Sequence, residues 1–477
     1  MLTIPWEAFA LTGWLLVAIA AGLHALLKLP DPRAAWGWIA VTLLFPFAGP
    51  VLYVLFGINR VQTRARQIVQ ALPEALRSPD HEDAREQTAL RDRLNLRLPL
   101  VHTGDTVTGS PLLSGNGIRP LSNGEQAFPP MLAAIDAAEH SIALATYIFE
   151  TNRAGRDFIA ALERAHERGV DIRILVDGIG ELYSLPRAVR LLRRRGIRCA
   201  RFHPPQLLPP SLHVNLRNHR KVLLVDGRIG FTGGMNIGSR YLVEQPQSTQ
   251  AADTHFEMTG PILSQLATVF SADWYLATGE TWAPTCWDTD QPAQGESICR
   301  VITDGPNEDL DHLRLVMQAA IGSASERIRI MTPYFLPPPE LEATLTGAAL
   351  RGVQVDVLLP AKNDVRAVHY ASRHKLDRMM ESGLNIWYQP PPFRHNKLFV
   401  IDDDYALIGS ANLDARSLRL NFELAVEVYD EAFAASLHTL FNRSIDDSQR
   451  LTRETLNQRG ALERVRDAAC WLFSPYL

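Results

Sequence analysis

The chain has 477 residues, which leaves room for more than one domain with a sizeable core. Its apolar fraction of 46% and charged fraction of 21% are typical of a folded protein. The formal net charge of −4 excludes a global basic field that would attract nucleic acid, although a local basic groove remains possible. The four cysteines have neither CxxC nor metal-ligand spacing, which favours a reduced compartment; they are Cys199, Cys286, Cys299 and Cys470.

The N-terminal region contains two long apolar runs. Residues 8–27 are almost entirely apolar and have about the length of a helix that crosses a bilayer. A short loop separates them from an uncharged run over residues 34–57. A signal peptide would begin with basic residues, whereas the charged side chain that precedes the first run is Glu7. We therefore predict a transmembrane helical hairpin over residues 1–59, in preference to a signal peptide followed by a buried core helix.

Charge around the two runs predicts the orientation of this anchor. Three arginines (Arg60, Arg64 and Arg66) follow the second run, whereas the loop between the runs carries two basic residues and one acidic residue. The positive-inside rule therefore places the rest of the chain on the cytoplasmic side of a multi-pass anchor, by a narrow margin. Residues 60–105 are polar with a helical pattern, and we predict there a linker with a juxtamembrane helix near the membrane surface.

The remainder of the chain is an internal duplication. The segment RGVDIRILVD (168–177) matches RGVQVDVLLP (351–360), and TYIFE (146–150) matches PYFLP (333–337). Each copy alternates short apolar strands with amphipathic helices. We predict an α/β fold in which two tandem α-β-α lobes form one pseudo-twofold catalytic unit. The predicted bounds are 106–281 for the first lobe, 282–301 for a connector and 302–477 for the second lobe.

One motif, H-x-K-x4-D-x6-G-[GS]-x-N, occurs in each copy. It reads HRKVLLVDGRIGFTGGMN at 219–236 and HNKLFVIDDDYALIGSAN at 395–412. On a strand the histidine and the lysine project from the same face, because they are two residues apart. The chain has five lysines and two stand in the motif, which indicates a need for a compact ammonium rather than a guanidinium. A single H-x-K is more often a core histidine than a catalyst, but two complete motifs predict a shared site.

If the two lobes pack face to face, the two motifs form one site. The motifs then combine two imidazoles, two ammonium groups and two amides, from His219, His395, Lys221, Lys397, Asn236 and Asn412. This set suits a phosphodiester, because lysines and amides hold the non-bridging oxygens while one histidine attacks phosphorus. The other histidine protonates the leaving alcohol and deprotonates the incoming one. We expect no metal and no other cofactor, because the lysines supply the positive charge.

Four acidic residues complete the candidate site. Asp226 and Asp402 are the aspartates of the two motifs and stand among the catalytic candidates. Their odd interval from the histidines nevertheless favours a structural role in bracing the hairpin turn. Asp253 and Glu423 are the best candidates for carboxylates that orient the imidazoles.

The two copies differ where these orienting carboxylates stand. When DTHFEMTGP (253–261) is aligned with NFELAVEVY (421–429), Glu423 faces His255 rather than Asp253. We infer that the orienting residue differs in position between the copies, or that the two histidines have unequal roles. Gly234 and Ser410 are predicted to let the backbone approach the phosphate as substrate-binding residues; ordinary turn residues are the equally weighted alternative.

The doubled motif resembles that of the phospholipase D superfamily, in which H-x-K-x4-D marks each half of the site. The stretch AWGWIAVTLLFPFAGPVLYVLFGINR and the blocks MTPYFLPP and DTH…TGP are similar to those of its bacterial cardiolipin synthases. The resemblance covers essentially the whole chain and implies a site between two lobes, at the bacterial inner membrane. It also implies a phosphohistidine on His219, with His395 as acid/base, and phosphatidyl transfer between two phosphatidylglycerol molecules with release of glycerol.

The same residues are compatible with several alternative functions. A hydrolytic phospholipase D shares every catalytic residue, and the acceptor alcohol could also be phosphatidylethanolamine or another alcohol. The acidic balance and the anchor disfavour a nuclease, and the complete His-Lys pairs disfavour an inactive scaffold. No D-G-x2-A-R…D-x3-D pattern and no P-loop occur, so the expected donor is a phospholipid. The expected partners are thus phospholipid substrates and the bilayer, and the insert PPQLLPPSL before His219 is a candidate for dipping into it.

Overall fold

The computed structural model describes residues 6–29, 31–45, 47–57, 84–204, 206–207, 210–211, 216–245, 249–282, 284, 287, 292–305, 310–475 and 477. The chain divides into two compact units, Met1–Gln67 (the helical unit) and Ile68–Leu477 (the sheet unit). The three arginines on which the expected orientation depends lie outside the described residues. So do most of the side chains of the apolar insert; its backbone contributes the short strands β5 (Gln206–Leu207) and β6 (Pro210–Ser211).

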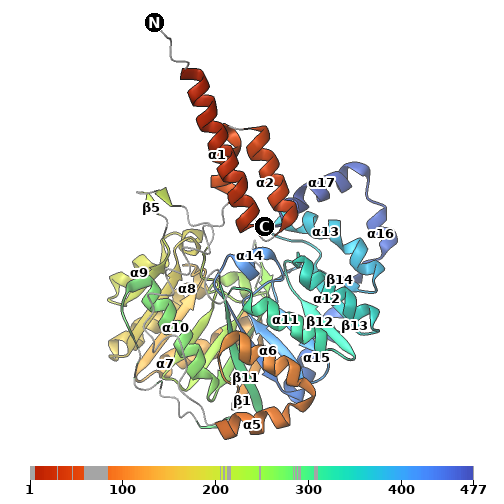
Figure 1. Ribbon diagram of the computed structural model, residues 1–477. Coiled ribbons are helices and arrows are strands. Elements are labelled where there is room, and N and C mark those ends of the chain that lie inside the picture. Colours follow the sequence, from red (N-terminus) through yellow and green to blue (C-terminus); the bar gives the residue numbers. More distant parts are fainter. Residues whose placement is uncertain are drawn as a thin grey trace. The chain divides into compact units, whose positions relative to one another are not determined.

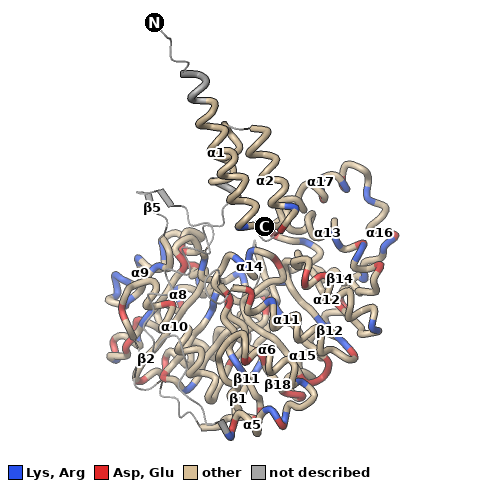
Figure 2. Tube along the Cα trace, viewed as in Figure 1, with Lys and Arg blue, Asp and Glu red and all other residues tan. Residues whose placement is uncertain are grey.

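The helical unit consists of α1 (Trp6–Lys28), α2 (Pro32–Leu44), α3 (Ala48–Leu52) and the π-helix η1 (Tyr53–Gly57). α1 and α2 lie side by side (Figure 1) and carry almost no charged residues (Figure 2). Asp31 caps α2 by accepting a hydrogen bond from the backbone N–H of Arg33. Residues 11–28 of α1 form the one helical segment of the described chain that is long and apolar enough to cross a membrane. α2 has 13 residues, fewer than the roughly 20 that a bilayer requires, so a second span stays a prediction.

The sheet unit is built on one mixed sheet in the order β19-β14-β13-β12-β16-β17-β18-β11-β1-β10-β8-β7-β2-β3-β4. The first-lobe strands are β1 (Leu113–Ser122), β2 (Ser141–Thr146), β3 (Asp171–Asp177), β4 (Cys199–Phe202), β7 (Val222–Val225), β8 (Ile229–Gly233) and β10 (Thr254–Thr259). The second-lobe strands are β11 (Ser297–Asp304), β12 (Arg327–Met331), β13 (Gln354–Pro360), β14 (Asn385–Gln389), β16 (Leu398–Ile401), β17 (Tyr405–Gly409), β18 (Glu423–Tyr429) and β19 (Gln449–Arg450).

The strand order shows the duplication directly. β1 and β11 pair antiparallel at the centre, with Leu113 opposite Cys299 and Asn116 opposite Ser297. Outward from β1 the order is β10-β8-β7-β2-β3-β4, and outward from β11 it is β18-β17-β16-β12-β13-β14. The repeated segments of the sequence therefore become β3 and β13, which occupy equivalent places. The predicted α/β fold of two tandem lobes is confirmed.

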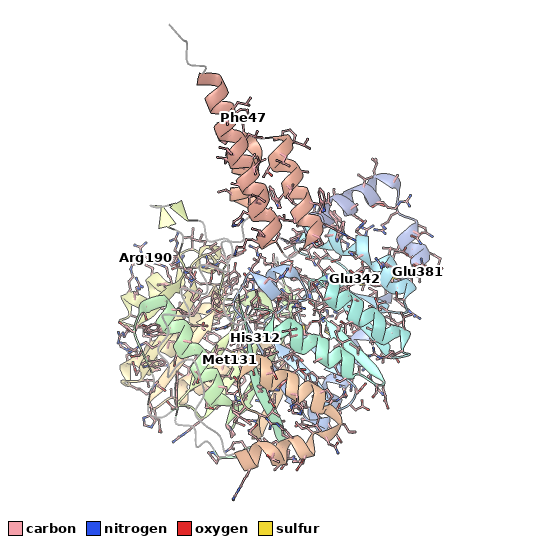
Figure 3. All side chains as sticks on the ribbon, viewed as in Figure 1. Phe47, Met131, Arg190, His312, Glu342 and Glu381 are labelled. Atoms are coloured by element: carbon pink, nitrogen blue, oxygen red, sulfur yellow. The ribbon has the colours of Figure 1, made fainter. Side chains whose placement is uncertain are left out.

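Helices cover the sheet in each lobe. The principal helices are α5 (Ala84–Arg93), α6 (Leu98–Thr108), α7 (Asn123–Ala137), α8 (Arg153–Glu167), α9 (Ala188–Arg194), α10 (Ile262–Thr278), α11 (His312–Ser323), α12 (Pro339–Leu350), α13 (Arg366–Glu381), α14 (Ala415–Arg419), α15 (Glu431–Asp446), α16 (Arg453–Asn457) and α17 (Ala461–Trp471). Met131 of α7, labelled in Figure 3, belongs to the first-lobe core together with Phe158 of α8. All six residues of β2 are buried, so both faces of this strand are covered.

Residues 84–105 differ from the expected linker, because they pack onto the second lobe. Leu100 and Val101 of α6 are fully buried in the second-lobe core. A guanidinium nitrogen of Arg97 donates to Asp402 at 2.9 Å and binds Asp404 as well. The chain from α5 onward thus belongs to the sheet unit. Likewise β11 begins at Ser297, inside the segment expected to be a connector.

Candidate active site

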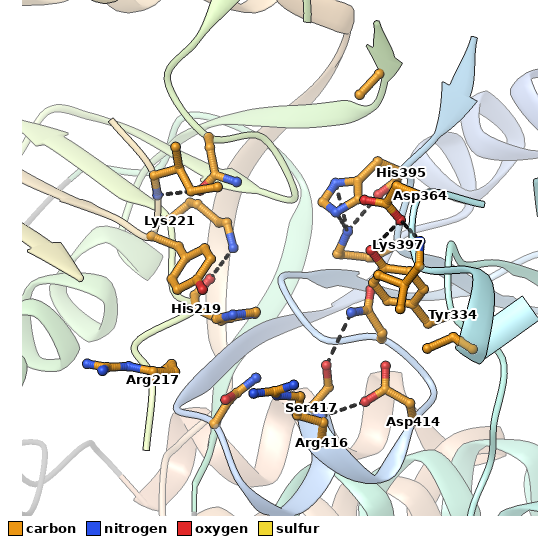
Figure 4. A pocket seen from close by; sticks show the side chains of 18 of the residues that line it. Arg217, His219, Lys221, Tyr334, Asp364, His395, Lys397, Asp414, Arg416 and Ser417 are labelled. Carbon is orange, nitrogen blue, oxygen red and sulfur yellow. Dashed lines mark hydrogen bonds between the residues drawn. The ribbon is translucent and has the colours of Figure 1, made fainter. Parts of the chain in front are cut away.

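A cavity of about 390 Å³ lies between the two lobes, and both motifs line it. His219 and Lys221 enter from the first lobe, and His395 and Lys397 face them from the second (Figure 4). The intervening residues turn away, as the two-residue period requires: Arg220 binds Asp273, and the Asn396 amide donates to Thr254. The predicted convergence of the two motifs is therefore present in the structure.

Each histidine is fixed by the backbone of the other lobe. The N–H of His219 donates to the carbonyl of Phe422 at 2.9 Å, and the N–H of His395 donates to the carbonyl of Ala252 at 2.8 Å. The residue that follows each acceptor is a carboxylate, Glu423 or Asp253. These exchanged hydrogen bonds bring each carboxylate to the imidazole of the opposite lobe.

The carboxylates contact the Nδ1 atoms. Asp253 Oδ2 lies 2.8 Å from Nδ1 of His395, and Glu423 Oε1 lies 3.3 Å from Nδ1 of His219. Both carboxylates are almost completely buried. Because Nδ1 faces the carboxylate, Nε2 of each ring is the nitrogen left for chemistry in the cavity.

The strand register corrects the expected alignment of the two carboxylates. His255 pairs with Gly233 in the first lobe, and Ala425 pairs with Gly409 at the equivalent position of the second. Asp253 is therefore equivalent to Glu423, not to Asn421, and the orienting residue has not moved between the copies. The sequence alignment slipped by two residues, a slip that leaves the inward and outward faces of a strand unchanged.

Burial shifts the titration of all four motif side chains. Burial lowers the pKa of His219 against the opposing charge of Glu423. Burial and then the adjacent ammonium of Lys397 lower the pKa of His395 to about 4, although Asp253 opposes them. Burial likewise lowers the pKa of Lys221 to about 8 and that of Lys397 in the same direction. Both imidazoles are thus neutral near pH 7, as a nucleophile must be.

The lysines are held by their own motifs. Nζ of Lys221 donates to the carbonyl of His219 at 2.5 Å, and Nζ of Lys397 donates to the carbonyl of His395 at 2.6 Å. Lys397 differs in lying 3.0 Å from Nδ1 and 3.2 Å from Nε2 of its own histidine. Both ammonium groups point into the cavity, where an anionic ligand would bind.

The remaining predicted residues fall into two groups. Asn236 and Asn412 line the cavity; the Asn236 carbonyl oxygen accepts from the N–H of Ile148 at 3.0 Å. Gly234 and Ser410 do not line it, because they lie behind the carboxylates. The Ser410 hydroxyl donates to Glu423 Oε2 at 2.5 Å, and a Cβ at Gly234 would lie 2.5 Å from Asp253 Oδ2. In the structure these two residues contact the orienting carboxylates Asp253 and Glu423 rather than the cavity where substrate would bind.

The motif aspartates lie outside the cavity, in the turns of the β7–β8 and β16–β17 hairpins, at the ends remote from the histidines. Asp226 accepts hydrogen bonds from three consecutive backbone N–H groups, at residues 139–141. Asp402 accepts from those of residues 325–327 and from Arg97. Both have left-handed backbone, with φ of 53° and 48°. This geometry matches the bracing role and gives no support to their inclusion among the catalytic candidates.

The cavity also contains residues that sequence reasoning missed. The ring of Tyr147 lies 4.2 Å from that of His219, measured between centroids, and Tyr334 lines the opposite wall. Both tyrosines stand in the repeated TYIFE and PYFLP blocks, so the repeat could have identified them as candidates. Arg217 has no counterpart in the second motif, so no repeat indicated it. Its Nε donates to Asp177 at 3.0 Å. Asp414 also lines the cavity, and burial raises the pKa of its carboxyl to about 7.

The fold and the doubled His-Lys cavity define a two-lobed phospholipase D-like protein, and comparisons agree. The family "Cardiolipin synthase, PLD-like domain" matches residues 131–274 and 317–445, and "Phospholipase_D-nuclease N-terminal" matches residues 12–57. A cardiolipin synthase A of Pseudomonas aeruginosa is 32% identical over 100% of this chain and 97% of its own length. A probable cardiolipin synthase of Bacillus subtilis is 30% identical over 92% of this chain and 88% of its own.

A solved structure shows the same fold. A phosphatidylserine synthase of Haemophilus influenzae superposes with a TM-score of 0.63 at 17% identity, over 79% of this chain and 100% of that one. The chain belongs to the cardiolipin synthases of the phospholipase D superfamily. It is a membrane-associated enzyme of cardiolipin synthesis whose substrates are phospholipids.

Proposed function

We propose that the enzyme transfers a phosphatidyl group from one phosphatidylglycerol to the glycerol headgroup of a second, releasing glycerol through a phosphohistidine. The observation that carries this proposal is the pair of imidazoles, each with a lysine and a buried carboxylate, on opposite walls of one cavity. Two opposed acid/base groups suit two successive in-line displacements at one phosphorus. Neither displacement requires a nucleotide.

In the first step, Nε2 of His219 attacks the phosphorus of the donor. An N–P bond forms, the P–O bond to glycerol breaks, and His395 gives its Nε2 proton to the departing glycerol oxygen. Glu423 holds the His219 ring with Nδ1 directed away from the phosphate and stabilises the charge that develops on it. Lys221, Lys397, Asn236 and Asn412 surround the non-bridging oxygens.

In the second step, His395 accepts the proton of a glycerol hydroxyl on the second phosphatidylglycerol. The hydroxyl oxygen attacks phosphorus, the N–P bond breaks, and His219 returns to its neutral form. Asp253 maintains the tautomer of His395 in both steps. The cycle forms and breaks one P–O bond overall, which explains why no external energy source is required.

The protonation of His395 depends on the substrate. Among the protein's own groups, burial and Lys397 lower its pKa to about 4, which disfavours the imidazolium needed as the acid. A phosphodiester anion between the two lysines compensates their charge and therefore raises the pKa of His395. Substrate binding thus prepares the general acid.

The helical unit would anchor this chemistry at the bilayer. We infer that α1 spans the membrane and that α2, α3 and η1 complete a hairpin, which leaves the sheet unit in the cytoplasm of the bacterial cell. The apolar character of both helices supports their insertion in the membrane, and the arginines after the second apolar run support the orientation. A first lobe that ends near residue 281, a second lobe that begins at β11, and a bilayer contact of the insert before His219 belong to the same proposal.

One incubation tests the proposed reaction. The full-length protein in proteoliposomes is given phosphatidylglycerol alone, with chelator and without nucleotide, and the lipid and water-soluble products are identified. Cardiolipin and glycerol in equal amounts are expected. Phosphatidic acid as the main product would instead assign the site to hydrolysis.

A further inference from the structure

The cavity is too small for a whole phospholipid. Its volume of about 390 Å³ is in the range that encloses a drug-sized molecule, which suits a phosphate with its glycerol groups but not two acyl chains. The chains must therefore remain outside the mouth. Since every methylene withdrawn from the bilayer into water costs free energy, the mouth must lie at the lipid surface.

The exposed apolar side chains of the sheet unit are concentrated beside this mouth. Most of the large ones in its described residues fall in three segments, namely Leu182 to Leu185, Val365, and α17 with the turn after it. The remaining ones are Leu96, Leu315 and Leu350. Isolated apolar residues on a surface are ordinary, but a group of them around a ligand site marks an interaction surface.

The first two segments follow equivalent strands. Leu182 to Leu185 follow the carboxyl end of β3, and Val365 follows that of β13; Tyr183 and Val365 themselves line the cavity. Both segments therefore lie at the edge of the sheet where the site opens. Exposed basic residues accompany them, with Arg187 beside the first segment and Arg366 beside the second.

The third segment is an amphipathic helix whose apolar stripe has no partner within the described residues. Leu462 and Val465 lie about 60° apart on the helical projection of α17, and Leu472 and Phe473 follow in the turn after it; all four are exposed. The opposite side of α17 packs on α13, with Asp467 fully buried there. Trp471 and Leu477 join an apolar cluster with Tyr334 and Val368, which line the cavity. Figure 1 shows α13, α14 and α17 at one end of the sheet unit.

We propose that these three segments form a rim that binds the surface of an anionic bilayer, so that the sheet unit docks on the membrane independently of the helical unit. The rim is continuous with the substrate cavity, and its arginines complement anionic headgroups. This inference rests on the lipid substrate proposed above but concerns a different surface. It explains how a headgroup reaches the histidines while its acyl chains stay in the membrane.

A double substitution tests the rim on full-length protein. Leu185→Ser with Phe473→Ser removes two side chains that are 83% and 62% exposed. The matched control is Leu96→Ser with Leu350→Ser, which are 87% and 73% exposed. Leu350 precedes β13 and Leu96 adjoins the Asp402 turn, so both lie at the end of the sheet remote from the mouth.

Cardiolipin formation is measured against the mole fraction of phosphatidylglycerol in proteoliposomes, and separately with a short-chain phosphatidylglycerol below its critical micelle concentration. The rim variant is expected to raise the apparent KM at the vesicle surface about tenfold and to leave the rate on the monomeric substrate unchanged. The control should change neither. Equal vesicle kinetics for rim and control, or equal losses of the rim variant on both substrates, would overturn the proposal.

Two further readouts separate the alternatives. A fluorescent non-natural side chain at position 185 should shift to the blue in vesicles, whereas one at position 350 should not. If the rim instead binds a second copy, the rim variant would lower the mass of the detergent-solubilised protein without this spectral change, which would contradict a lipid partner. If wild type makes no cardiolipin from phosphatidylglycerol, the proposed reaction fails while the spectral shift still reports on the rim.

Discussion

His219 and His395 occupy equivalent positions in the two lobes, yet their surroundings differ. His219 faces the longer carboxylate, Glu423, at 3.3 Å and packs beside Tyr147. His395 faces the shorter Asp253 at 2.8 Å and has the Lys397 ammonium beside both ring nitrogens. The exchange of carboxylates between lobes is therefore common to both half-sites, whereas each imidazole has its own electrostatic environment. Unequal environments suit unequal roles, a nucleophile and a proton carrier.

Outside the two motif histidines, the largest expected effect comes from neutralising the exchanged carboxylates one at a time. Glu423→Gln and Asp253→Asn should each lower the rate of cardiolipin formation by on the order of 10²–10⁴, because each histidine loses the group that fixes its tautomer. Asp253→Asn should cost about tenfold more, since its contact is shorter and no ring packs as closely on His395 as Tyr147 does on His219. Thermal unfolding serves as the folding control. Equal losses of rate in the two variants would contradict the predicted difference between the two half-sites.

Gly234 and Ser410, the residues behind the two carboxylates, should also differ in their effects on the rate. Gly234→Ser places a Cβ 2.5 Å from Asp253 Oδ2, so the carboxylate must move, and a loss of roughly 10²-fold is expected. The reverse exchange, Ser410→Gly, removes one hydrogen bond to Glu423 and should cost about tenfold. Steady-state rates of the two variants in identical proteoliposomes check the order. A harmless Gly234→Ser would show that Asp253 is not held where the structure places it.

The two lysines should differ in their pH dependence. Burial lowers the pKa of Lys221 to about 8, so its ammonium is lost as pH rises through that value and kcat/KM should fall above it. The corresponding fall in kcat should occur at higher pH, because a bound phosphate anion stabilises the ammonium. Lys221→Arg should abolish the alkaline fall in kcat/KM, whereas Lys397→Arg should retain it. If the fall persists in Lys221→Arg, a group other than Lys221 causes it.

The motif aspartates should affect stability rather than turnover. Asp402→Asn should lower the free energy of unfolding by about 3 kcal/mol, and Asp226→Asn by less, because Asp402 also binds Arg97. Burial raises the pKa of Asp402, but backbone N–H donors and Arg97 outweigh it and bring the pKa to about 2. The stabilisation is therefore complete above the ordinary aspartate pKa of about 4 and is lost as pH falls toward 2.

Thermal unfolding across this pH range provides the measurement. The difference between wild type and Asp402→Asn should narrow on acidification, and the rate per folded molecule at neutral pH should stay within about twofold. A loss of rate comparable to that of the carboxylate variants would return Asp402 to the chemistry.

The sequence predicted the parts of this site that depend on local spacing. A two-residue interval placed His219 with Lys221 on one face, and the odd interval directed Asp226 away from the cavity. The duplication predicted that β3 and β13 occupy equivalent places in the two lobes. These features need no knowledge of how the lobes pack.

Features that depend on contacts between distant segments could not be predicted from local spacing. The alignment of Asp253 slipped by two residues because a strand keeps its faces under such a slip, and only the pairing of His255 with Gly233 reveals the register. Residues 84–105 read as a polar linker, since the ion pair that docks them joins Arg97 to Asp402, about 300 positions along the chain. Arg217 and Asp414 reach the cavity from loops without a repeated pattern.

We propose that the two half-sites play different roles at one phosphorus. His219→Ala and His395→Ala should each lower turnover by at least about 10⁵-fold, because each group acts in both displacements. The direct test is rapid quenching of each variant with radiolabelled phosphatidylglycerol, followed by mass spectrometry of the protein. We predict a covalent phosphatidyl adduct on His219 in the His395→Ala variant and none in His219→Ala. An adduct on His395 in the His219→Ala variant alone would reverse the roles and contradict the account.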